Sequence, residues 1–129
     1  MIKILNRYWK IFTFVNFIII TFLSLYPLPE LPNEMGSDKI HHLIAFCSLT
    51  FSIAIVQPAH FKKLILFFIT YGGFIELIQS YFNRYGEFID FVYNTTGIFI
   101  SLIIGYLFNK YHKKNFANQD ISTMFNFKR

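Results

Sequence analysis

Ionisable side chains stand immediately before an apolar stretch in the segment SDKIHHLIAF, residues 37–46. Asp38 and His42 are four residues apart, so on a helix they lie on one face, close enough for a hydrogen bond. His42, oriented by Asp38, could act as a general base, and Arg84 or Lys39 could stabilise developing negative charge. The simpler interpretation is that Ser37 or Asp38 caps the helix and that the remaining groups are structural.

A second polar pair interrupts apolar sequence further along the chain. Glu76 and Gln79, in the segment ELIQ, are three residues apart and share a helical face. An unpaired carboxylate is costly in apolar surroundings, so we expect Glu76 either to have a basic partner such as Arg84 or Lys39 or to be protonated. A polar contact that holds two helices together would explain Glu76 equally well.

A third group begins the last apolar stretch. Asp90, Asn94, Gly97, Ser101 and Gly105 follow one another at spacings of three or four residues, so they form one stripe on a helix. The small residues of this stripe predict that another helix approaches closely. Asp90 and Asn94 need polar partners, because polar side chains near the mouth of a helix bundle are expensive to leave unpaired.

Four apolar segments must position these groups, at residues 11–26, 43–56, 64–78 and 88–108. The chain is 54% hydrophobic and only 15% charged, which is too apolar for an ordinary soluble domain. A chain of 129 residues also has too little interior to bury so many aromatic side chains. We therefore expect an all-α polytopic membrane protein, with a bundle of four transmembrane helices.

The basic residues predict the orientation of this bundle. They cluster before the first segment, between the second and third, and after the fourth, at Lys3, Arg7, Lys10, Lys62, Lys63, Lys110, Lys113 and Lys114. Loops rich in lysine and arginine stay in the cytoplasm, so both termini are expected there. The expected organisation is a transmembrane domain at residues 1–114 and a polar cytoplasmic tail at residues 115–129. Because the bases are scattered over separate loops, no nucleic-acid partner is expected.

This topology brings all three polar groups to the outer face of the membrane. We predict that they line one binding pocket, formed by Asp38, Lys39, His42, Glu76, Gln79, Arg84, Asp90 and Asn94. No metal or other cofactor is predicted. Adjacent histidines such as His41 and His42 point about 100° apart on a helix, so both could bind one ion only if the helix started after them.

Taken together, the motifs resemble those of the VanZ-like membrane proteins. The resemblance covers residues 37–101 and rests on SDKIHHLIAF, ELIQ, Arg84, Asp90, Asn94 and Gly97 at the family's spacing. Tyr85 stands where the family usually has a small residue, and Ser101 replaces a second glycine. The resemblance implies a small multi-pass protein of the inner (cytoplasmic) membrane of a bacterium. It also implies a context in the cell envelope, since the founding member is linked to low-level resistance to the antibiotic teicoplanin, but no settled catalytic activity.

Two functions remain open at this point. In the first, the protein binds a lipid headgroup, a lipid-linked cell-wall precursor or a lipophilic glycopeptide antibiotic at the outer leaflet. In the second, it is an intramembrane hydrolase or transferase that acts on a lipid-linked phosphate or headgroup. Binding is favoured because neither Ser37 nor Ser80 lies in a motif that demands a nucleophile. Ion conduction is disfavoured because no polar residues continue to the inner face, and the oligomeric state stays open.

Overall fold

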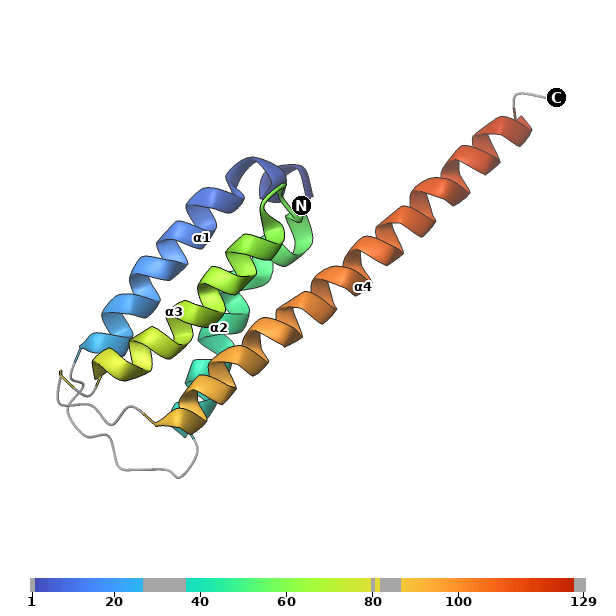
Figure 1. Ribbon diagram of the computed structural model, residues 1–129. Helices are drawn as coiled ribbons and strands as arrows, with labels where there is room; N and C mark the ends of the chain where they lie inside the picture. Colours follow the sequence, from blue (N-terminus) through green and yellow to red (C-terminus); the bar gives the residue numbers. More distant parts are fainter. Residues whose placement is uncertain (1, 27–36, 80, 82–86, 127–129) are drawn as a thin grey trace.

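The computed structural model describes residues 2–26, 37–79, 81 and 87–126, and within them the side chains of residues 3–26, 38–79, 81 and 87–112. This part of the chain contains helices and no strand. The four helices are α1 (Ile2–Leu25), α2 (Ser37–Val56), α3 (Phe61–Gln79) and α4 (Phe88–Asn126) (Figure 1). The prediction of an all-α protein is confirmed for the described residues.

The helices are longer than the apolar segments that predicted them. α1 begins at Ile2 rather than at Ile11, and α2 begins at Ser37 rather than at Leu43. α4 continues to Asn126, so residues 115–126 of the predicted tail extend the same helix. Hydropathy marks only the apolar part of a helix, whereas the backbone hydrogen bonds continue through flanking polar residues that tolerate helical geometry.

The ends of the first two helices coincide with prolines. α1 ends at Leu25, two residues before Pro27. α2 ends at Val56, where Gln57 adopts a left-handed φ of 47° directly before Pro58. Proline lacks the N–H that would continue a helix and restricts the residue before it. The Phe61 N–H donates to the Pro58 carbonyl at 2.8 Å, so a short turn joins α2 to α3.

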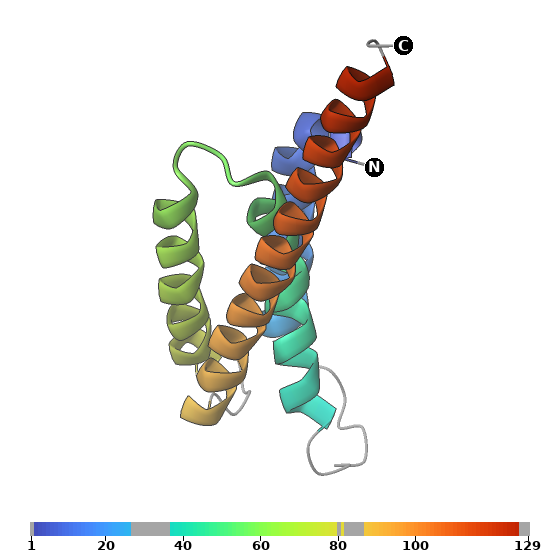
Figure 2. The same cartoon turned by 90° about the vertical axis from the view of Figure 1, so that its right-hand side faces the viewer.

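Four helix ends meet at one end of the molecule. They are the C-terminal ends of α1 and α3 and the N-terminal ends of α2 and α4, at the lower left of Figure 1 and the bottom of Figure 2. We call this region the site end. It brings together Asp38, Glu76 and Asp90, which come from three separate helices. The opposite end of α4 extends away from the other helices (Figure 1).

Three of the four helices are long and apolar enough to cross a membrane: α1 from Lys3 to Leu25, α2 from Asp38 to Val56, and α4 from Phe88 to His112. α3 has 19 residues and includes Lys62, Lys63 and Glu76. Large apolar side chains are exposed on every helix, which water would not tolerate but lipid does. The chain is therefore a multi-pass membrane protein.

The closest helix packing joins α2 to α4. A Cβ atom added at Gly97 would collide with the Leu43 carbonyl oxygen, and one added at Gly105 would lie 2.5 Å from the Ala54 carbonyl oxygen. Between these points the hydroxyl oxygens of Thr50 and Ser101 are 2.6 Å apart. The prediction that this stripe of small residues admits another helix is confirmed, and the partner is α2.

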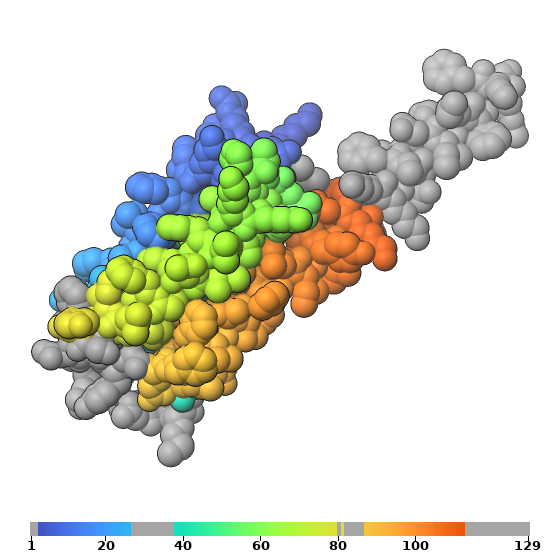
Figure 3. All heavy atoms as spheres, in the orientation of Figure 1, coloured from blue at the N-terminus to red at the C-terminus, as the bar shows by residue number. Residues whose placement is uncertain are grey.

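α2 lies at the centre of the bundle. On the face seen in Figure 3, α1, α3 and α4 lie side by side and cover nearly all of α2. Its fully buried side chains Phe46, Leu49 and Ile53 pack in one core with Ile75 of α3 and Ile98 of α4. This core fixes α2 against its neighbours, and the polar groups at the site end are positioned by it.

α1 contacts this core through aromatic rings and a few hydroxyl groups. The Thr13 and Ser52 hydroxyls are 2.8 Å apart, and so are the Thr21 and Tyr71 hydroxyls. Phe17 packs against the Tyr71 ring at a centroid distance of 4.8 Å. Most of the apolar surface of α1 is nevertheless exposed, so this helix is the least embedded part of the bundle.

Candidate ligand site at the end of the bundle

Three buried side chains form the inner part of the site. The Asn94 amide donates from Nδ2 to Glu76 Oε1 at 2.7 Å, and its Oδ1 lies 3.0 Å from Nδ1 of His42. His42 Nδ1 is also 3.5 Å from Glu76 Oε1. Each of the three comes from a different helix, so the contacts form only when α2, α3 and α4 are packed together.

The direction of these hydrogen bonds indicates which ring nitrogen of His42 carries a proton. Because Nδ2 of Asn94 faces the Glu76 carboxylate, its Oδ1 faces the imidazole and can only accept a hydrogen bond. Nδ1 of His42 therefore carries a proton. In the neutral ring this leaves the lone pair on Nε2, which points away from the core and towards the two aspartates of the site.

The two aspartates complete the site on the outer side of His42. Asp38 Oδ2 lies 4.0 Å from His42 Nε2, beyond hydrogen-bond distance. Ligand atoms of Asp38, His42 and Asp90 all lie within 4.8 Å of one another. Both aspartates are in the first turn of their helices, where the helix dipole favours negative charge. The sequence spacing predicted the Asp38–His42 pair, but Asn94 is the residue that orients the ring through Nδ1.

Two carboxylate oxygens of this site have no hydrogen-bond partner among the described residues. They are Oε2 of Glu76 and Oδ1 of Asp90, and both are buried. Asp90 as a whole is only 3% exposed. A buried carboxylate without a partner costs several kcal/mol unless a cation or proton compensates it, so the site is electrostatically incomplete as the described residues define it.

The other predicted site residues Lys39 and Gln79 have partners outside this cluster. Lys39 Nζ is 3.6 Å from Glu87 Oε2, so Lys39 pairs with Glu87 and not with Glu76. Gln79 is buried and donates from Nε2 to the Ser24 carbonyl at 3.0 Å, which joins α3 to α1. Arg84 lies outside the described residues. Of the predicted pocket, the structure thus brings together Asp38, His42, Glu76, Asp90 and Asn94 in one cluster, and Gln79 lines a groove together with Asp38 and His42.

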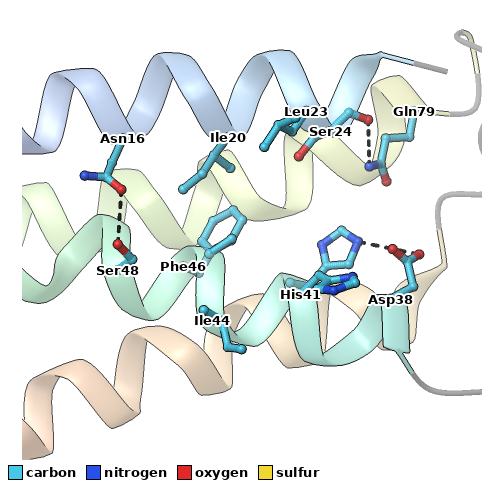
Figure 4. A pocket seen from close by; sticks show the side chains of 12 residues that line it. Asn16, Ile20, Leu23, Ser24, Asp38, His41, Ile44, Phe46, Ser48 and Gln79 are labelled. Carbon is cyan, nitrogen blue, oxygen red and sulfur yellow. Dashed lines mark hydrogen bonds and ion pairs between the residues drawn. The ribbon is translucent and has the colours of Figure 1, made fainter. Parts of the chain in front are cut away.

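A groove leads away from this cluster between α1 and α2. It has a volume of about 450 Å³ and runs past Asp38, His41 and His42 to a deeper Ser48–Asn16 hydrogen bond of 3.1 Å. Its walls are mostly apolar and include Ile20, Leu23, Ile44 and Phe46 (Figure 4). In the same view, Ser24 and Gln79 lie at one end, and a dashed line marks the 4.0 Å contact between Asp38 and His42.

Sequence reasoning missed the α1 wall of this groove and also missed Glu87. The lining residues of α1, such as Asn16 and Ser24, carry no pattern that separates them from ordinary lipid-facing or packing residues. Glu87 precedes an apolar segment and looks like a helix-capping residue. Only the packing of α1 on α2 and the meeting of α2 with α4 reveal these roles.

The chemistry of the described cluster favours binding of positive charge. Asp38, Glu76 and Asp90 supply three carboxylates to the described cluster, whereas its only basic group is the imidazole of His42. Among the described side chains, no hydroxyl group hydrogen-bonds to His42. A hydroxyl nucleophile activated by this histidine is therefore not part of the described geometry.

No protein-family model, curated protein or solved structure matches this chain. The resemblance to the VanZ-like proteins therefore stays a prediction, which rests on the sequence motifs.

Proposed function

We propose that this protein binds an amphiphilic molecule at the outer leaflet of the cytoplasmic membrane of a bacterium. In this proposal all four helices cross the membrane, both termini are cytoplasmic, and the site end faces outward. The ligand is a membrane lipid or a lipid-linked cell-wall precursor, whose polar head reaches the cluster around His42 and whose chain lies in the groove. A VanZ-like protein that handles a lipophilic glycopeptide such as teicoplanin would use the same combination of surfaces.

One observation carries this proposal: the polar cluster opens directly into an apolar groove. Asp38 and His42 belong both to the cluster and to the groove wall. An amphiphile needs such a polar end and an apolar channel in continuity, whereas a water-soluble ligand would leave the apolar wall unused. The wall from Asn16 to Ser24 covers eight residues of helical rise, or about 12 Å, which suits part of an acyl chain.

The alternative is an intramembrane hydrolase or transferase that acts on a lipid-linked phosphate. It would use the same site, with water activated at Nε2 of His42. Binding has the stronger support, because the described cluster holds three carboxylates, which would repel the negative charge that develops on a phosphate under attack.

Filling the groove tests the binding proposal. Ile44 lines the groove and is 58% exposed, and Ile103 on α4 is 59% exposed and lies outside it. We expect Ile44→Trp to remove most of the lipid that copurifies with the wild type, and Ile103→Trp to retain it. Native mass spectrometry of the purified proteins measures the bound lipid class and its occupancy. Equal occupancy in both variants, or no bound lipid in the wild type, would contradict the proposal.

A further inference from the structure

We propose that Asp38, His42 and Asp90 bind one divalent first-row metal ion, such as Zn²⁺, at the site end. Asp38 and His42 lie one helical turn apart on α2, and Asp90 faces them from α4. Their ligand atoms all lie within 4.8 Å of one another. Ligands at about 2.1 Å from a tetrahedral metal are about 3.4 Å apart, so the three atoms need to close by little more than 1 Å.

Asp38 is the ligand that must move most to close this distance. Its side chain is 61% exposed, whereas the side chain of His42 is 9% exposed and held by Asn94. Asp90 is fixed by burial at the start of α4. Two ligands are thus preorganised, and the third reaches the ion from the solvent side.

A separate observation calls for a cation at this point. Asp90 is only 3% exposed, and its Oδ1 has no hydrogen-bond partner among the described residues. Lys39, on the same turn of α2, has its Nζ 3.6 Å from Glu87 Oε2 and forms no ion pair with Asp90 among the described contacts. A metal ion beside Asp90 would complete the coordination of this oxygen and offset the cost of burying its charge.

The inner cluster has the form of a support for a metal-binding histidine. Such a histidine donates a hydrogen bond from its other ring nitrogen, which fixes the tautomer and the ring orientation. Here Nδ1 of His42 faces Oδ1 of Asn94, and the Asn94 amide is itself oriented by Glu76. Nε2 is left free to ligate an ion. Glu76 and Asn94 are then positioning residues, which explains two buried polar side chains in an apolar bundle.

The ligand types select the class of metal. One imidazole and two carboxylates suit Zn²⁺ or Mn²⁺, whereas Ca²⁺ and Mg²⁺ prefer oxygen ligands alone. No metal was predicted from the sequence, because the adjacent histidines His41 and His42 diverge on a helix and could share one ion only if the helix started after them. The structure removes that requirement, since only His42 belongs to the cluster and the remaining ligands come from Asp38 and Asp90.

A bound metal would also resolve the charge of the proposed ligand site. The described cluster is rich in carboxylates and would repel an anionic phosphate headgroup. A metal ion with an open coordination position towards the groove would instead accept a phosphate oxygen. This last step rests on the proposed function, whereas the metal site itself does not.

The test uses the full-length protein, purified in detergent through a tag without histidine and stripped with a chelator. Isothermal titration with Zn²⁺ should show one high-affinity site for each chain, and elemental analysis should find about one ion after dialysis. Asp90→Asn keeps the shape of the side chain and removes its charge, so we expect at least a tenfold loss of affinity without a loss of folding. His42→Gln should have a similar effect.

His60→Gln is the matched control, because His60 is exposed and lies at the turn between α2 and α3. It should bind Zn²⁺ like the wild type. Absence of a stoichiometric site, or an Asp90→Asn protein that binds as tightly as the wild type, would overturn the inference. Both measurements are made without added lipid. Loss of metal binding with intact lipid binding would refute only the metal site, and the reverse result would refute only the proposed lipid function.

Discussion

Asn94 connects the two halves of the site through a single amide group. It donates to Glu76 and accepts from His42, so its two ends cannot be exchanged without breaking both contacts. The sequence supplied the members of this cluster, because ionisable groups stand out in apolar sequence. It could not supply their pairing. Spacing along one helix relates Asp38 to His42, whereas the contacts of Asn94 cross between helices and depend on how the helices pack.

Substitutions at Glu76 separate its charge from its hydrogen bond. In Glu76→Gln the new amide oxygen can still accept from Asn94, so we expect the stability to change by less than about 1 kcal/mol. Glu76→Ala leaves the Asn94 donor buried and unpaired, which costs about 1–3 kcal/mol. Unfolding of the purified proteins by heat in detergent measures the difference.

Ligand binding should follow a different order at the same residue. Both Glu76 variants remove the negative charge beside His42, so Glu76→Gln should weaken lipid binding more than it weakens folding. If Glu76→Gln unfolds as readily as Glu76→Ala, the carboxylate acts as a structural partner of a charged His42 and the positioning role is refuted.

At the scale of the elements, the packing of α2 on α4 determines the geometry of the site. Gly97 lies three residues after Asn94, and the Leu43 carbonyl that it contacts belongs to the residue after His42. The sequence predicted that a helix would approach this stripe. It did not identify α2 as that helix, because small residues allow any neighbouring helix to approach closely and do not determine which one does.

An added methyl group at this contact should therefore disturb both folding and binding. Gly97→Ala would push the Leu43 backbone away, and we expect a loss of about 1–3 kcal/mol together with weaker lipid binding. The control is Gly73→Ala on α3, where the new Cβ would meet the Phe91 ring at an ordinary distance of 3.5 Å.

Gly73→Ala should be neutral or stabilising by up to about 1 kcal/mol, since alanine favours the helix over glycine. Unfolding titrations in mixed detergent micelles compare the two variants with the wild type. Equal stabilities for Gly97→Ala and Gly73→Ala would show that the α2–α4 contact relaxes easily, contrary to this account.

At the scale of the whole molecule, the proposed orientation depends on α3 as a fourth span. This helix has 19 residues, or about 28 Å of helical rise, close to the thickness of a bilayer core. Lys62 and Lys63 stand at its first turn, where their side chains can reach the headgroups. Hydropathy alone found this segment. Its three charged residues distinguish it from α1, α2 and α4, which are the described helices with the composition of a membrane span.

Reporter fusions test this topology directly. Fusions at Asn6, Lys62 and Asn115 should report the cytoplasm, and fusions at Asn33 and Arg84 should report the outer side, because the basic loops are retained inside. Paired reporters, active on opposite sides of the membrane, serve as each other's control. A cytoplasmic signal at Asn33 would invert the bundle and place the groove in the inner leaflet.

The contact between the α2 and α4 backbones also has a mechanical meaning. Carbonyl groups at Leu43 and Ala54 meet glycine at Gly97 and Gly105, so no side-chain rotamer can change the separation of these helices. α1 is held instead by aromatic contacts and by hydroxyl pairs, and such pairs contribute about 0.6 kcal/mol each within a membrane. The bundle therefore has a stiff side and a compliant side. The groove lies on the compliant side, where a small displacement of α1 can adjust its width to ligands of different thickness while the distance between His42 and Asn94 stays constant.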